Sequence, residues 1–426
     1  ARNPLQALDL IEKMGEKKSA FFVLKDFYKF LNDVVICRKV KNLLQSLKKQ
    51  SKTIIITANE IDIPSELFSF FIILEFTLPT AQEIRLELKR LFECIGQEPD
   101  VKFIEALTRA CQGLTLEKVR QTLSKSLARS NTINNTTIDI ILDEKRQIVA
   151  KTQILDFPKT ETRLIDIGGL NNLKYWLKIR RRSFTEKAEL YGIPTPKGLV
   201  LAGIEGSGKS LTAYAIAGEC KLPFMQLDVG RLFEGVIGES VKRVRQMIQI
   251  VEALAPCILW IDEIDKAFVN QTQQTDSGTT NRVTGTFLTW LSEKQSPVFV
   301  VATANHLDSI PLEVIRKGRF DEIFFVDLPT KQERKQIFAV ILHRLRPATK
   351  QQFNLDLLSN SANGFSGSEI EQAVIEAMHK AFSEEREFNE NDIIISLQQI
   401  IPLSIVDSKR TKQLREWAES GRLRIA

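Results

Sequence analysis

The sequence predicts an α/β fold, in which a parallel sheet with a phosphate-binding loop is followed by a helical lid and preceded by a partial, degenerate copy of the same plan. Three observations predict this fold. A glycine-rich loop lies between a buried strand and a helix, and a second apolar strand ends in two carboxylates. In addition, the N-terminal third repeats landmarks of the C-terminal half in the same order, which indicates two copies of one architecture.

The phosphate-binding loop follows the pattern G-x-x-x-x-G-K-[ST] between a predicted strand at 198–202 and a predicted helix at 211–217. Its glycines let backbone N–H groups point at a phosphate, and the helix N-terminus adds its positive end. Lys209 is expected to reach the β- and γ-phosphates, and the Ser210 hydroxyl to ligate Mg²⁺. A chance glycine-rich turn is the alternative, which the flanking strand and helix disfavour. The residues expected to bind the nucleotide here are Gly203, Ile204, Glu205, Gly206, Ser207, Gly208, Lys209, Ser210 and Leu211.

The second apolar run, residues 257–261, ends in Asp262 and Glu263. A strand buried on both faces of a parallel sheet has this composition, and such sheets bind ligands at the carboxyl ends of their strands. We expect Asp262 to complete the Mg²⁺ shell opposite Ser210, and Glu263 to polarise the water that attacks the γ-phosphate. An acidic pair at an ordinary strand end is the alternative, and the phosphate-binding loop upstream makes it the weaker one.

Three further polar residues follow along the chain. Asn305 ends the next predicted strand and could orient the attacking water, with an ordinary turn asparagine as the alternative. Arg316 and Arg319 lie three positions apart around a glycine. Guanidinium groups bind phosphate oxygens bidentately, and an arginine from a neighbouring subunit stabilises charge in a phosphoryl-transfer transition state. Two solvated surface arginines are the alternative, and their spacing after Asn305 favours the functional interpretation.

The composition is that of an ordinary folded protein. A length of 426 residues predicts two or three domains, and a net charge of +6 is small enough that a solvated surface is favoured over an acidic partner. Five scattered cysteines indicate reduced thiols rather than disulfides, and three histidines show no metal-binding spacing. No apolar run reaches the ~20 residues of a membrane span. The chain starts with Ala1 and no signal pattern, so we expect it to begin partway into a longer protein.

An internal repeat relates the two parts of the chain. Residues 300–305 end in Thr-Ala-Asn and are followed by Ile-Pro, Leu-Pro, a charged amphipathic helix and a glycine turn, and residues 54–59 begin the same series. The first copy lacks the phosphate-loop half, either by truncation or by divergence. It has Phe27 where the second has Glu263 and no counterpart of the arginine segment, so we expect it to be catalytically silent.

These landmarks divide the chain into four expected parts. Residues 1–130 form the degenerate copy, with a sheet remnant at 1–80 and a helical lid at 81–130. A linker with a connecting helix follows at 131–160, bounded by two polar breaks. Residues 161–330 form the large α/β part, and residues 331–426 form its helical lid and C-terminal tail.

The order of these parts over residues 165–426 resembles the AAA family of ATPases, through the Gly-Gly segment 165–170, the phosphate-binding loop, the acidic pair, Asn305 and the two arginines. It looks closest to a divergent group of cyanobacteria and algal plastid genomes, the hypothetical chloroplast reading frame forty-six, whose first ATPase domain is degenerate. The resemblance implies an AAA-type P-loop sheet with a helical lid. It also implies residue roles: Gly168 and Gly169 line the adenine pocket, Asn305 is the first sensor, Arg316 and Arg319 act in trans, and Gly367 and Ser368 occupy the second-sensor position.

Two departures from that family bear on function. Ile204 and Glu205 replace the usual prolines, although the loop glycines are kept, so nucleotide binding is still expected and Glu205 is expected to slow exchange. Val236 stands where polypeptide-threading members carry an aromatic residue, which leaves threading and non-threading mechanisms both open.

We therefore expect an enzyme that binds ATP and Mg²⁺, hydrolyses ATP to ADP and phosphate, and assembles into a ring, expected to be a hexamer, that remodels a protein partner. The alternative is a nucleotide-gated switch or scaffold with low turnover, which the silent first copy and Val236 favour. A nucleic-acid-handling function is disfavoured by the weak net charge and by the lack of a basic-aromatic stripe. The resemblance implies the chloroplast (plastid) stroma or a cyanobacterial cytoplasm as the location.

Overall fold

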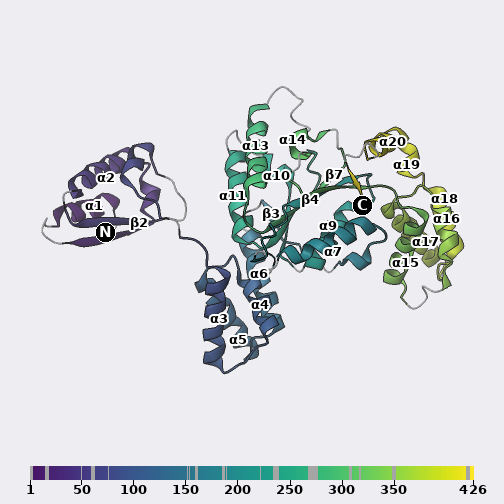
Figure 1. Cartoon of the computed structure of the whole chain (residues 1–426), viewed down its shortest axis with the longest axis horizontal. Coiled ribbons are helices and arrows are strands. Elements are labelled where there is room, and N and C mark those ends of the chain that lie inside the picture. Colours follow the sequence, from purple (N-terminus) through teal and green to yellow (C-terminus); the bar gives the residue numbers. More distant parts are fainter. Residues whose placement is uncertain are drawn as a thin grey trace. The chain divides into compact units, whose positions relative to one another are not determined.

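The structure is a computed structural model of the chain. It describes all residues except 1–2, 15–18, 49, 59–62, 75, 151, 153, 159–161, 185–187, 189, 221, 234–238, 267–276, 307–308, 316–317, 348–351 and 419–422. The chain divides into two compact units, Ala1–Thr77 and Leu78–Ala426 (Figure 1). The predicted α/β fold with a mostly parallel sheet and many helices is confirmed.

The first unit contains a two-stranded parallel sheet of β1 (Ala20–Lys25) and β2 (Lys52–Thr57). Their side chains alternate between a core face and an open face, as expected for a half-buried sheet. On the core face they pack with residues of α1 (Pro4–Lys13), α2 (Val34–Leu47), η1 (Phe27–Phe30) and η2 (Ser65–Phe70). On the open face Phe21 and Val23 are exposed.

The second unit is built on a seven-stranded sheet in the order β3-β5-β6-β7-β4-β8-β9. Its strands are β3 (Leu155–Asp156), β4 (Gly198–Gly203), β5 (Phe224–Leu227), β6 (Cys257–Ile261), β7 (Val298–Ala304), β8 (Glu322–Val326) and β9 (Arg424–Ile425). β3 is antiparallel to β5, and the other neighbouring pairs are parallel. Every residue of β4, β6 and β7 is buried, which explains their continuous apolar sequences. The carboxyl ends of these three strands therefore lie side by side at the centre of the sheet.

Helices cover both faces of this sheet. α7 (Asn171–Arg180) and α9 (Lys209–Cys220) share one hydrophobic cluster with one face, and α11 (Glu239–Ala253) and α13 (Ser277–Glu293) share another with the opposite face (Figure 1). Short elements connect them: η3 (Leu164–Asp166), η4 (Arg181–Phe184), α10 (Val229–Phe233) and α14 (Leu312–Ile315).

A helical lid with its own core follows the sheet. It comprises α15 (Lys331–Leu345), α16 (Leu355–Ser361), α17 (Gly367–Ser383) and α18 (Glu390–Gln399), after which come α19 (Leu403–Val406) and α20 (Ser408–Trp417). α15, α17 and α18 each begin with a capping box, which satisfies backbone N–H groups that have no partner within the helix.

A second helical bundle precedes the sheet, formed by α3 (Ala81–Ile95), α4 (Val101–Cys111), α5 (Leu116–Ser130) and α6 (Asn135–Ala150). The sequence places residues 81–130 with the N-terminal sheet as its helical lid, and residues 131–160 in a linker with a connecting helix. The unit boundary falls after Thr77, and α6 belongs to the bundle because Ile141 is part of its core. Val149 of the same helix is part of the core of the α/β sheet.

The internal repeat is visible in the helices that follow each sheet. α3 and α15 both begin with a Thr-x-x-Glu capping box, from Thr80 to Glu83 and from Thr330 to Glu333. The glycine turn that precedes α5 and the one that precedes α17 have the same left-handed conformation, with a φ of 83° at Gly113 and at Gly364. Two copies of one architecture explain these matches.

The repeat is also visible in the strands, where it corrects one residue of the expected alignment. Lys25 pairs with Thr57 in the first copy. In the second copy the last pair of β6 and β7 is Ile261 with Ala302, and the next two residues, Asp262 and Thr303, are joined by a side-chain hydrogen bond. The next residue in each copy has a left-handed backbone, with a φ of 55° at Asp26 and 49° at Glu263. Asp26, rather than Phe27, thus corresponds to Glu263. Lys25 therefore corresponds to Asp262, and the ammonium of a lysine cannot replace a carboxylate as a metal ligand.

Candidate functional site

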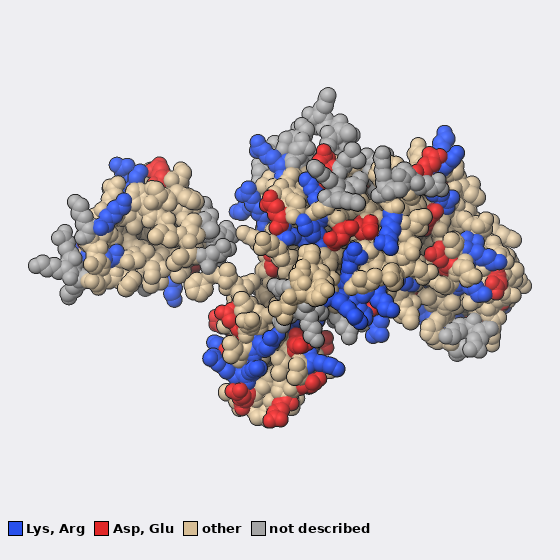
Figure 2. All heavy atoms as spheres, in the orientation of Figure 1, with Lys and Arg blue, Asp and Glu red and all other residues tan. Residues whose placement is uncertain are grey.

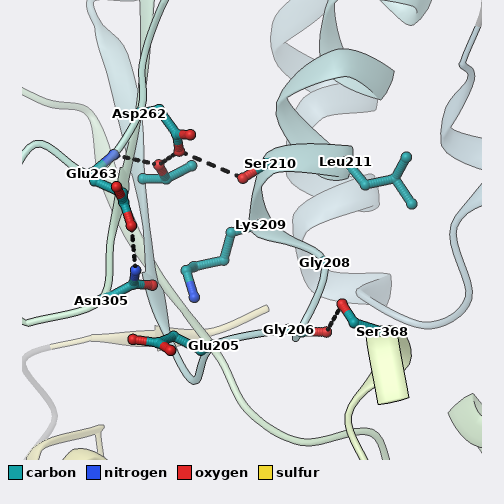
Figure 3. Close-up of a pocket in the computed structure, with 11 residues that line it drawn as sticks. Glu205, Gly206, Gly208, Lys209, Ser210, Leu211, Asp262, Glu263, Asn305 and Ser368 are labelled. Carbon is teal, nitrogen blue, oxygen red and sulfur yellow. Dashed lines mark hydrogen bonds between the residues drawn. The ribbon is translucent and has the colours of Figure 1, made fainter. Parts of the chain in front are cut away.

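A cavity of about 270 Å³ lies at the carboxyl ends of the central strands β4, β6 and β7 (Figure 3). Its lining combines the phosphate-binding loop with the polar residues that end β6 and β7 and with the first turn of α17. All of the lining residues except Thr303 were predicted from the sequence. They are Glu205, Gly206, Gly208, Lys209, Ser210, Leu211, Asp262, Glu263, Thr303, Asn305 and Ser368.

The phosphate-binding loop adopts a conformation that needs its glycines. Gly206 and Gly208 have φ values of 73° and 91°, in the left-handed region that other residues rarely adopt. Lys209 is buried at the start of α9, and its ammonium donates to the carbonyl oxygens of Gly203 at 2.9 Å and Ile204 at 2.6 Å. Figure 3 shows its side chain extending from the loop into the cavity, toward Asn305. The loop thus holds one positive charge at the cavity wall.

Ile204 and Ser207, which belong to the predicted loop but do not line the cavity, stabilise the conformation of the loop. The backbone N–H of Ile204 donates to the carbonyl of Val326 at 3.3 Å, and the Ser207 hydroxyl donates to the Ile204 carbonyl at 2.6 Å. A Cβ atom at Gly203 would lie 2.1 Å from the same Val326 oxygen, so only glycine allows β4 and β8 to approach this closely.

The acidic pair at the end of β6 is held by its neighbours. The Ser210 hydroxyl lies 3.5 Å from Asp262 Oδ1, and the Thr303 hydroxyl donates to the same oxygen at 2.5 Å. Glu263 Oε1 accepts a hydrogen bond of 3.1 Å from the Asn305 amide, and its other oxygen pairs with the Lys266 ammonium. The hydrogen bond and charge of Glu263 raise the pKa of Lys266. Both carboxylates therefore have defined orientations.

The charges of the cavity fit a polyphosphate only together with a cation. Glu205, Asp262 and Glu263 contribute three carboxylates, against the single ammonium of Lys209. Oxygen ligands of this kind suit Mg²⁺, and the Ser210 hydroxyl next to Asp262 supplies the donor pair that the phosphate-loop pattern requires. The residues present therefore fit a Mg²⁺–nucleotide complex.

Gly168 and Gly169, which are expected to line the adenine pocket, contact helix α15 of the lid and are not among the residues that line the cavity. Gly169 N–H donates to Gln336 Oε1 at 2.8 Å, and a Cβ at Gly168 would lie 2.7 Å from Ile337 Cγ1 of α15. A Cβ at Gly367 would lie 3.9 Å from Ile337 Cδ1, so one side chain adjoins both glycine segments.

The first turn of α17 joins the lid to the phosphate-binding loop. Both the N–H and the hydroxyl of Ser368 donate to the carbonyl oxygen of Gly206, each at 3.1 Å. A Cβ at Gly367 would lie 3.6 Å from that oxygen, and one at Gly206 would lie 2.8 Å from the Ser366 hydroxyl. The second-sensor segment is thus in contact with the loop.

Arg319, one of the two residues expected to act in trans, is not among the described residues that line the cavity. Arg319 is half-buried, and its guanidinium donates to the carbonyl of Glu313 in its own subunit. Arg316 and Val236 lie outside the described residues.

Two residues of the site, Thr303 and Lys266, are not predicted from the sequence. Thr303 was noted within the repeated Thr-Ala-Asn run, but its contact with Asp262 depends on the register of β6 against β7. The signal that could have found it is the pairing of two apolar strands that both end in polar residues. Lys266 follows Glu263 by three positions in a turn, a spacing that the sequence alone does not distinguish from a solvated lysine.

Three family models match separate parts of the chain. One, described as the ATPase family associated with various cellular activities (AAA), matches residues 199–328. The other two, described as the N-terminal and second domains of SpoVK-like AAA ATPases, match residues 1–76 and 82–152. Their limits fall on either side of the division after Thr77.

Several relatives match the full length of the chain. The AAA domain-containing protein ycf46 of Trieres chinensis is 53% identical over 425 residues, which cover 100% of this chain and 86% of that protein. The ycf46 protein of Guillardia theta is 52% identical over 425 residues, with 100% and 84% covered. The proteasome-activating nucleotidase of Sulfurisphaera tokodaii is more distant, at 29% identity over 275 residues, 62% of this chain and 69% of that protein. The chain therefore belongs to the AAA ATPase family, within its group of ycf46 AAA domain-containing proteins.

Proposed function

We propose that this protein binds Mg²⁺–ATP in the cavity at the end of the central strands and hydrolyses it to ADP and phosphate. The observation that carries the proposal is the convergence of Lys209, Ser210, Asp262 and Glu263 on that one cavity. Lys209 would neutralise the β- and γ-phosphates, while Ser210 and Asp262 would hold the cation. When bound, Mg²⁺ offsets charge on the phosphate oxygens and orients them for in-line attack.

Glu263 would act as the general base for the attacking water. Its carboxylate accepts the proton that the water loses as the oxygen attacks the γ-phosphorus, and Asn305 keeps the carboxylate oriented by its hydrogen bond of 3.1 Å. Lys266 binds the other carboxylate oxygen, so the base is held from two sides.

We further propose that the protein works as a homo-oligomeric ring, a hexamer, with Arg316 and Arg319 serving the cavity of the next subunit. The position of Arg319 supports this proposal, because its guanidinium binds a carbonyl of its own chain and does not line its own cavity. The ring would remodel a protein partner. A nucleotide-gated scaffold with low turnover remains the second candidate, favoured by the lysine that corresponds to Asp262 in the first unit.

A role in handling nucleic acid is not proposed. Figure 2 shows acidic side chains beside basic ones on the faces in view, and the net charge of +6 is weak for a nucleic-acid-binding protein of this size. None of the described helices combines the length and apolar character needed to cross a membrane. We propose the plastid stroma, or a cyanobacterial cytoplasm, as the location, supported by the ycf46 relatives in algae.

The substitution Glu263→Gln tests the catalytic proposal. The variant should bind ATP with parental affinity and hydrolyse it at least 100-fold more slowly, since it keeps the shape of the side chain and loses the base. Glu376→Gln, on the exposed side of α17, is the matched control and should hydrolyse ATP normally. Equal turnover by Glu263→Gln and the control would exclude Glu263 as the base.

A dilution series tests the ring. If an arginine acts in trans, the rate per subunit should fall steeply as the protein is diluted through the concentration at which the oligomer dissociates. A rate per subunit that stays constant while sedimentation shows dissociation would exclude a trans-acting arginine. Turnover that rises on addition of a protein partner would distinguish remodelling from the scaffold candidate.

A further inference from the structure

Thr303 is a buried residue of the cavity lining that the proposed reaction does not use directly. It lies near the end of β7, is only 1% exposed, and lines the cavity beside Asp262 and Glu263. Its buried hydroxyl makes two interactions: it donates to Asp262 Oδ1 at 2.5 Å and accepts from the backbone N–H of Glu263 at 3.0 Å. The one hydroxyl is thus shared by the two acidic residues.

The backbone of Thr303 adds a third link to the same turn. Its carbonyl accepts the N–H of Ile264 at 2.9 Å, so the three consecutive residues 262–264 all bind Thr303. Glu263, in the middle, has a φ of 49°. A left-handed conformation costs a non-glycine residue about 1–2 kcal/mol and persists only where the surroundings enforce it. The hydrogen bonds that Thr303 accepts from the backbone N–H groups of Glu263 and Ile264 supply that enforcement.

We propose that Thr303 is a positioning residue for both carboxylates: its hydroxyl orients Asp262 toward Ser210 and the cation, and holds the Glu263 backbone so that the base faces Asn305. This inference rests on the proposed ATPase function. A threonine suits the position because branching at Cβ leaves few side-chain rotamers, so the hydroxyl direction is largely fixed by β7 itself. Outer-shell partners of this kind typically change metal affinity or activity by about 10–100-fold when they are removed.

The test compares Thr303→Val, which keeps the shape and loses the hydroxyl, with Thr303→Ser, which keeps the hydroxyl. The valine variant should lose about 10–100-fold in kcat and need several-fold more Mg²⁺ for its half-maximal rate. Its affinity for ATP without Mg²⁺ should stay within about twofold of parental, because Thr303 does not contact the phosphate-binding loop in the described contacts. The serine variant should recover most of the activity.

Thr122→Val in α5 is the matched control for loss of a buried hydroxyl, since Thr122 is 0% exposed and donates to the Lys118 carbonyl at 2.8 Å. It should leave both kcat and the Mg²⁺ dependence unchanged. Parental kcat and Mg²⁺ dependence in Thr303→Val would overturn the inference, even though the ATPase proposal would stand.

A binding measurement keeps the inference testable without turnover. Mg²⁺-dependent tightening of ATP binding, measured by calorimetry, should weaken in Thr303→Val and in Asp262→Asn, and the double variant should show little further loss because the hydroxyl acts through Asp262. Additive losses would overturn the coupling. Absence of hydrolysis by the parent, with this coupling intact, would instead remove the proposed catalytic function.

Discussion

Lys145 offers a prediction about stability that the structure makes quantitative. It lies on one face of α6 with Ile141 and Val149, where the bundle core meets the core of the sheet. The side chain is 0% exposed, and its ammonium has no hydrogen-bond partner among the described residues. Burial is the main cause that lowers the pKa of Lys145 from 10.5 to about 8, while the sulfur atoms of Cys111 on α4 and Cys257 on β6 act weakly in the opposite direction.

The difference between 10.5 and about 8 corresponds to about 3 kcal/mol of unfolding free energy. Below pH 8 the lysine is charged in both the folded and the unfolded chain, and the folded state bears the full cost of burying the charge. Between pH 8 and 10.5 only the unfolded chain keeps the proton, so stability rises with pH and the cost disappears. Lys145→Met should therefore stabilise the protein by about 3 kcal/mol at pH 7, and by only about 1 kcal/mol at pH 9.5.

Guanidinium unfolding followed by tryptophan fluorescence would measure this effect, since all four tryptophans lie in the second unit. Lys102→Met on the exposed side of α4 removes the same charge without burial and should change stability little at either pH. A Lys145→Met variant that is less stable than the parent at pH 7, or that gains the same amount at both pH values, would refute the reasoning.

Two further predictions concern the contact of the bundle and the action in trans. Gly113→Ala should destabilise the second unit by about 3 kcal/mol or more in the same unfolding assay, because a Cβ there would lie 2.2 Å from the Ala253 carbonyl oxygen. The control is Gly96→Ala, where φ is 66° and nothing lies within 4 Å of the added Cβ, so the loss of stability should be only about 1 kcal/mol. Equal losses in the two variants would contradict the packing argument. Arg319→Ala and Glu263→Gln subunits, each with little ATPase activity alone, should regain up to about a quarter of the parental rate when mixed in equal amounts and reassembled, because each supplies what its neighbour lacks; a mixture as inactive as its components would argue against trans action.

The sequence was informative wherever function depends on residues close together in the chain. The phosphate-binding loop and the acidic pair each follow a strand within a few residues, so their local patterns predicted both their elements and their place in the sheet. The repeat was likewise readable, because the Thr-Ala-Asn runs, the Leu-Pro pairs and the glycine turns that mark it are short local patterns.

What could not be predicted depends on tertiary contacts. The contacts of Thr303 depend on the register of β6 against β7. The loss of stability caused by burying the Lys145 ammonium depends on the position of this residue between two hydrophobic cores. The equivalence of Asp26 and Glu263 was missed by one residue because a left-handed turn, rather than the amino-acid pattern, defines it. The division after Thr77 depends on which part of the chain α6 packs against. The sequence of α6 is only modestly amphipathic and does not predict its packing partner.

The sharing of α6 by two cores has a practical consequence for anyone shortening this protein. A truncation that starts at residue 161 would strip β3 from the edge of the sheet and leave the sites of Val149 and Leu155 open to water, so the remaining ATPase fragment should aggregate. A truncation that starts at Leu78 keeps α6 whole, together with every residue of the two hydrophobic cores that it joins. The bundle thus shields part of the sheet core from solvent, and a truncated protein should retain the bundle together with the AAA domain.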